Sequence, residues 1–116
     1  MNNNKIEVLE TASKYIVNLK MGINKAVEYY QEGRENEACN LIIPITEGME
    51  WLNNAIRLTS EIQKEPISFD VMNGKLVEVL EAFENSDYIL VGDLLEYEIM
   101  PIIQRIEEIV NKTINN

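Results

Sequence analysis

One segment of this 116-residue chain constrains its fold more than any other, the segment 87–110, DYILVGDLLEYEIMPIIQRIEEIV. At about 100° per residue, a helix here places one apolar set on one side: Tyr88, Val91, Leu95, Ile99, Ile102, Ile106 and Ile109. A second set falls on the opposite side: Leu90, Leu94, Tyr97 and Pro101. Because a helix that is apolar on two sides needs cover on both, this segment is predicted to be the central helix of a bundle.

Apolar residues at three- and four-residue steps predict further helices over 6–32, 35–64 and 70–84, and extend the last helix over 87–113. Gly33 suits a left-handed helix end, and Asp87 suits a helix N-cap. Ser68 or Asp70 is expected to cap the third helix. The sequence therefore predicts an all-α, four-helix, mostly antiparallel bundle of two helical hairpins in a single domain, 1–116. Pro44 and Pro101 predict a bend in the second and fourth helices.

The charge of the chain is strongly acidic and unevenly distributed. The net charge is −10, of which residues 65–116 carry −8. This argues against nucleic acid and anionic membranes as partners, since both attract Lys and Arg. Solubility is the simplest explanation of the acidity, and a basic partner surface is the alternative.

The residues that most enzymes need are scarce. The chain has no histidine, which removes the common nucleophilic triads and the usual zinc sites. Cys39 is the single cysteine and is expected to be a buried structural thiol. A lone cysteine, the lack of a long apolar run and the polar start of the chain favour a cytoplasmic protein. No catalytic residue and no cofactor are expected.

Carboxylates are the remaining candidates for catalysis. Glu47 and Glu50 lie one turn apart on the second predicted helix, and Asp93 and Glu96 lie one turn apart on the last. Facing pairs of this kind could hold Mg²⁺. GDLLE around Asp93 is similar to part of the second motif of the all-α nucleotide pyrophosphatases, although the motif's first glutamate would fall at Leu90. The alternative function is therefore a Mg-dependent hydrolase, and the favoured interpretation is a set of solvated acids.

A second apolar stripe on the second predicted helix matches the one on the last helix. It consists of Trp51, Ala55, Leu58 and Ile62. Four exposed apolar residues in a row are unusual on a monomer. We therefore expect these residues and Leu90, Leu94, Tyr97 and Pro101 to meet within the chain or across the two-fold axis of a homodimer, or to bind a partner.

Two resemblances add to this picture. EGMEWL (47–52) and SDYILVGDLLEYEIMPII (86–103) resemble segments of an uncharacterised family of small helical proteins. INKAVEYYQEGRENEACNLIIPITEGMEWLNNAI (23–56) is similar to the hairpin of flagellar export chaperones, cytoplasmic bundles that wrap the terminal helices of an exported protein. The second resemblance implies a chaperone-like role. The sequence as a whole predicts a non-enzymatic protein-binding or adaptor module.

Overall fold

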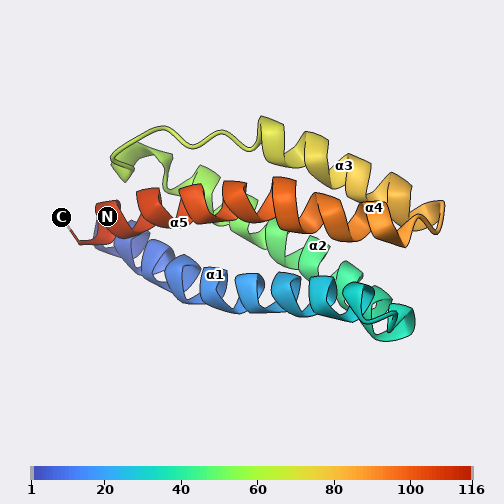
Figure 1. The fold of residues 1–116 in the computed structure, drawn as a ribbon. Coiled ribbons are helices and arrows are strands. Elements are labelled where there is room, and N and C mark those ends of the chain that lie inside the picture. The colour runs from blue at the N-terminus through green and yellow to red at the C-terminus, as the bar shows by residue number, and fades with distance from the viewer. Residues whose placement is uncertain (1, 116) are drawn as a thin grey trace.

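The computed structural model describes residues 2–115, and over that range the chain forms four helices and no strand (Figure 1). The predicted all-α bundle is thus confirmed. The molecule is elongated, with extents of 47 × 22 × 19 Å. Both hairpin turns lie at one end of the bundle, and the chain ends and the linker between the hairpins lie at the other (Figure 1).

The first hairpin joins α1 (Asn2–Gln31) to α2 (Glu35–Leu58). Gly33 has the predicted left-handed conformation, with φ of 75°, where a side chain would be strained. Helix α2 runs without a break through Pro44. The prediction that it continues to residue 64 is wrong, because it ends at Leu58 and is followed by a short 3₁₀ turn, η1 (Ser60–Ile62). Thr59 ends the helix by turning its hydroxyl back to the carbonyl oxygens of Ala55 and Ile56.

The second hairpin joins α3 (Asp70–Glu84) to a long helix made of three consecutive segments, α4 (Tyr88–Asp93), η2 (Leu94–Ile99) and α5 (Met100–Ile114). Asp87 caps this helix as predicted, since its carboxylate accepts the backbone N–H of Leu90 at 3.3 Å. The capping expected at the start of α3 is only partly present. Ser68 accepts the N–H of Asp70, but the residue at the cap position is Phe69.

Segment η2 is a π-helix, which the sequence analysis did not foresee. Its wider turns carry the N–H of Met100 to the carbonyl of Leu95, five residues back. Pro101 follows directly. In a regular α-helix its ring would clash with the carbonyl of Tyr97, and a wider turn at this place relieves that clash. A bend of the helix axis at Pro44 or Pro101 remains a prediction.

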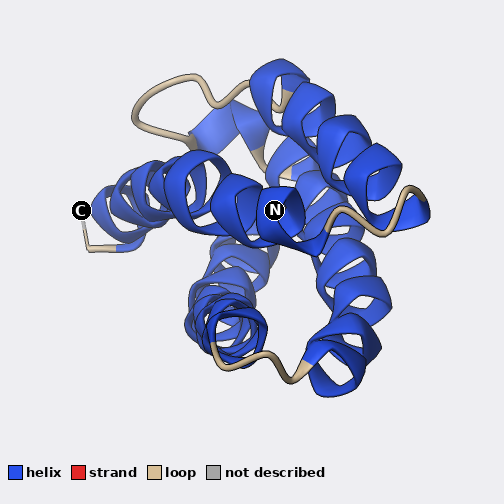
Figure 2. Ribbon diagram, turned by 45° about the vertical axis from the view of Figure 1, so that its right-hand side comes forward, coloured by secondary structure: helices blue, strands red, loops and turns tan. Residues whose placement is uncertain are grey.

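Helix α1 and the long C-terminal helix form the middle of the bundle (Figures 1 and 2). Helix α1 packs against α2 on one side and against α4, η2 and α5 on the other, while α3 packs on α4 and η2. The last helix is therefore packed between α1 and α3, but the predicted cover of its second apolar side is wrong, because Leu90, Tyr97 and Pro101 are exposed. Two polar contacts join α1 to α5: Ser13 donates to Asn111 at 2.8 Å, and Lys20 pairs with Glu107 at 2.7 Å.

The core is a continuous apolar cluster with members from every main helix. Its largest fully buried side chains lie mainly at positions that the periodicity predicts, and they include Leu9, Ile16, Ile23, Ile42, Met49, Leu52, Ile56, Met72, Val79, Leu95 and Ile99. Within the described range, no helix is long and apolar enough to cross a membrane.

Candidate functional site

The strongest candidate site is a groove along the outer seam between α1 and α2. Gly48 is buried in the middle of α2, and the ring of Tyr15 from α1 lies where a side chain at that position would be. Trp51, one turn further along α2, packs on the same ring, with centroids 5.0 Å apart and planes inclined at 55°. Glycine in a helix is costly, so its presence here indicates that the close approach of Tyr15 matters to the packing.

Two hollows meet at Tyr15 and Pro44. One, of about 480 Å³, is bordered by Thr11, Glu47 and Trp51, and the other, of about 150 Å³, extends along the seam to Gly22 and Leu41. Together they form what we call the seam groove: two adjoining shallow hollows that share Tyr15 and Pro44, with Trp51 at the edge of the larger one.

Exposed apolar residues of α2 extend the seam groove. Pro44, Trp51 and Leu58 are seven residues apart and therefore share one face of the helix. Trp51 is 40% exposed and Leu58 is 69% exposed. The two other predicted residues of this stripe differ, because Ala55 is buried and Ile62 is half-buried. Half of the predicted stripe is thus available to a partner, and the other half belongs to the protein interior.

The matching stripe predicted on the last helix is also divided. Leu94 is buried, whereas Leu90, Tyr97 and Pro101 are exposed, Tyr97 to 66%. Leu94 follows Val91 by three residues and therefore lies beside the main buried stripe, whereas Leu90, Tyr97 and Pro101 lie farther round the helix. Trp51 lies against Tyr15 of α1, so the stripe of α2 has a neighbour other than the one the sequence suggested.

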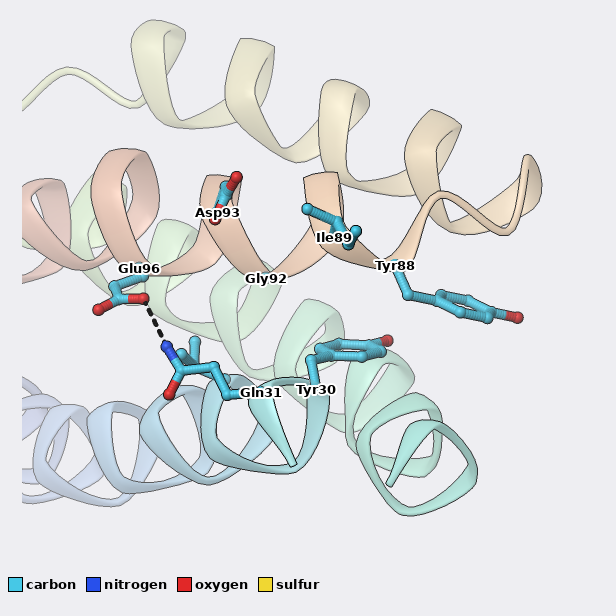
Figure 3. A pocket seen from close by; sticks show the side chains of 8 residues that line it. Tyr30, Gln31, Tyr88, Ile89, Gly92, Asp93 and Glu96 are labelled. Atoms are coloured by element: carbon cyan, nitrogen blue, oxygen red, sulfur yellow. Dashed lines mark hydrogen bonds between the residues drawn. The ribbon is translucent and has the colours of Figure 1, made fainter. Parts of the chain in front are cut away.

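A second, smaller pocket of about 120 Å³ lies between the end of α1 and α4 (Figure 3). Its wall is a stacked pair, Tyr30 and Tyr88, with ring centroids 5.7 Å apart. An added Cβ at Gly92 would lie 3.7 Å from the Cβ of Tyr30, an ordinary van der Waals distance, so the pair does not depend on a glycine there. At the other side Gln31 donates a hydrogen bond to Glu96 at 3.2 Å (Figure 3). Gln31 and Glu96, two of the polar side chains that line the pocket, are thus already paired with each other.

Tyr30 also connects this pocket to the single cysteine. Its hydroxyl lies 3.4 Å from the sulfur of Cys39, within hydrogen-bonding distance for sulfur. Burial raises the pKa of the Tyr30 phenol well above its usual range, and the hydrogen bond to Cys39 raises it further. The phenol therefore stays protonated. Cys39 itself is half-buried, whereas the sequence analysis predicted a fully buried thiol.

The four carboxylates of the hydrolase alternative lie in different places. Glu47 borders the seam groove and Glu50 is exposed on α2, whereas Asp93 and Glu96 border the pocket beside Tyr30. In that pocket Glu96 points toward Gln31, and Asp93 points away from it (Figure 3). Across residues 2–115, no three Asp, Glu, Cys or His side chains are close enough to hold a metal ion. The donor geometry that a Mg-dependent hydrolase requires is therefore not assembled.

Sequence reasoning missed the contact between Tyr15 and Gly48. The sequence does contain an indication of this contact. Pro44 and Gly48 both destabilise a helix, and a glycine kept at such a place suggests that the position must stay small.

A family model described as a domain of unknown function, DUF8042, matches residues 7–109. No protein with a curated description and no solved structure matches the chain. Since the match covers nearly the whole bundle, including the seam groove and the pocket beside Tyr30, the chain belongs to the DUF8042 family.

Proposed function

We propose that this protein is a non-enzymatic protein-binding module whose seam groove docks an amphipathic helix of a partner. The observation that carries the proposal is the exposure of Trp51 and Leu58 on one face of α2, where Trp51 packs on the ring of Tyr15. Tryptophan and tyrosine are the residues that most often dominate binding energy at protein interfaces. Shallow apolar grooves between helices are a common docking place for the apolar face of another helix.

The charges favour a partner helix with basic residues beside its apolar face. Glu47 borders the groove, Glu50 is exposed one turn away, and the whole chain has a net charge of −10. Such a field speeds association with a cationic segment and disfavours an acidic one. In its most specific form, the proposal is a chaperone-like role in which the partner is a helix of an exported or assembling protein.

The test starts with capture from cells of the source organism, using the wild-type chain and two variants. Leu58→Glu places a charge in the exposed stripe without touching the core, and Val77→Glu changes an exposed valine on α3 as a matched control. A helix mapped within the captured protein is then synthesised and its affinity is measured by calorimetry. We expect Leu58→Glu to weaken binding by about tenfold or more, and Val77→Glu to leave it unchanged.

The competing occupant of the groove is a second copy of the chain. Light scattering at micromolar concentration distinguishes the two, and we expect a monomer. A dimer that Leu58→Glu dissociates would show that the groove binds a second copy of the chain and not a partner helix. Capture of no protein by the wild type, or equal capture by Leu58→Glu, would contradict the docking proposal.

A further inference from the structure

A larger groove lies on another side of the bundle, between the linker 63–69, the start of α3 and α5. Its volume is about 620 Å³. Its floor and walls are apolar and come from all three parts of the chain: Ile67, Val71, Pro101, Ile102, Ile106 and Ile109. Val71 is 63% exposed although it faces this apolar surrounding. We call this depression the linker groove.

The linker that forms one wall is held at both ends. The backbone N–H of Lys64 donates to the hydroxyl of Thr113 at 3.1 Å, and the carboxylate of Glu65 pairs with Arg105 at 2.9 Å and with Lys112 at 3.5 Å. At the other end Phe69 is buried in the core. Because these contacts fix the wall to α5, the groove belongs to the folded structure and does not depend on a ligand to form.

Two basic side chains, Lys64 and Arg105, and one acid, Glu65, line this groove. After Lys64 the chain has three basic residues; Arg105 lines the groove, and Lys112 pairs with Glu65 in its wall. Lys64 borders the groove as well, and within the described part of the chain its ammonium group forms no ion pair. Arg105 pairs with both Glu65 and Glu108, and Lys112 pairs with Glu65, so the unpaired positive charge at the groove is that of Lys64.

We infer that the linker groove binds a single-chain amphiphile, with its apolar chain along Ile67, Val71 and Ile102 and an anionic headgroup at Lys64 and Arg105. Small-ligand sites typically have volumes of about 300–1,000 Å³, a mostly apolar lining and a few polar groups that fix orientation. The groove has these three properties. A carboxylate or phosphate headgroup suits a guanidinium beside an ammonium group.

The probe is dodecanoate, kept below the concentration at which it forms micelles, and the measurement is the NMR signal of the isoleucine methyl groups. We expect saturable shifts of Ile67, Ile102, Ile106 and Ile109, whereas the methyl groups of Ile16 and Ile23 in the core stay in place. Dodecyltrimethylammonium, which has the same chain and a cationic head, tests the headgroup and is expected to bind at least about tenfold more weakly.

Two pairs of variants test the position of the ligand. Val71→Asp introduces a negative charge into the groove, and Val77→Asp introduces the same charge on an exposed valine of α3 outside it. Val71→Asp is expected to weaken dodecanoate binding by about tenfold, and Val77→Asp to leave it unchanged. Lys64→Gln is expected to weaken binding several-fold at low salt, and Lys14→Gln, an exposed lysine of α1, to have no effect.

Each outcome supports the inference or overturns it. Shifts spread over exposed apolar residues on every helix, or equal effects of Val71→Asp and Val77→Asp, would show nonspecific adsorption. Equal affinity for the anionic and cationic amphiphiles would contradict the headgroup site. If dodecanoate causes no shift and a partner peptide shifts the same methyl groups, the groove is a protein-docking surface instead.

Discussion

The phenol of Tyr15 lies where a side chain at Gly48 would be: an added Cβ would overlap its hydroxyl oxygen and lie 3.1 Å from two of its ring carbons, Cε2 and Cζ. Because the ring also packs on Trp51, it cannot move without disturbing that contact. We therefore expect Gly48→Ala to lower the free energy of unfolding by about 1–3 kcal/mol, although alanine is intrinsically better in a helix. Urea denaturation measures this change.

The control for this prediction is Gly74→Ala in α3, where an added Cβ meets no atom within 4 Å. There the helix preference of alanine acts alone, and we expect stabilisation of up to about 1 kcal/mol. In a Tyr15→Ala background the ring is absent, so Gly48→Ala should no longer destabilise the protein. Equal stabilisation by both alanines in the wild-type background would show that Tyr15 does not depend on Gly48.

The two prolines within long helices are expected to respond differently to replacement by alanine. Pro44 lies inside a continuous α-helix, and Pro101 follows a π-helical segment. Pro44→Ala should therefore raise the free energy of unfolding, by up to about 3 kcal/mol. Pro101→Ala should change it by less than about 1 kcal/mol, since a proline near the start of a helical segment is tolerated. Chemical denaturation of the two variants provides the comparison, and a larger gain at Pro101 would reverse our interpretation of η2.

The stability of the protein is expected to fall at high pH in a way that depends on Tyr30. Burial raises the pKa of this phenol above its ordinary value of 10.0, with a further contribution from Cys39. Below that ordinary value both the folded and unfolded chains hold the proton, and stability from this group is fully present. Above it only the folded chain does, so the free energy of unfolding falls by up to about 1.4 kcal/mol per pH unit.

Tyr30→Phe should reduce this slope between pH 10 and the pH at which the native phenol ionises. Tyr97→Phe, which removes a mostly exposed phenol, is the control. Urea denaturation at a series of pH values measures the slope, and absorbance of the ionised phenol at about 295 nm follows Tyr30 directly. Identical slopes for the wild type and Tyr30→Phe would disprove the role of burial.

The attachment of the linker to α5 can be measured by hydrogen exchange. Thr113→Val removes the hydroxyl that accepts the Lys64 N–H but keeps the shape of the side chain. We expect exchange at the Lys64 amide to become about tenfold faster, in line with the loss of one hydrogen bond. Thr46→Val, which removes a hydroxyl bonded only within α2, should leave exchange at Lys64 unchanged. A rate at Lys64 that is equal in both variants would mean that the contact does not hold the linker.

The sequence by itself determined which residues form helices and which of them form the core. Apolar residues at three- and four-residue steps are a local property of the chain, so periodicity predicted the buried positions Ile16, Ile23, Ile42 and Met49. Turn chemistry is equally local. For that reason Gly33 and Asp87 were identified correctly at the helix ends where they lie.

Only the tertiary structure decided which surfaces remain open. On the last helix both apolar sides looked alike in the sequence, but the side of Leu90, Tyr97 and Pro101 is exposed and only Leu94 of that set is buried. The seam groove depends on the contact between Tyr15 and Gly48, and the linker groove depends on Glu65 meeting Arg105 and Lys112. These residues are brought together by the packing of helices that are distant in the sequence. Such contacts cannot be predicted from the charge or the spacing of residues along the chain.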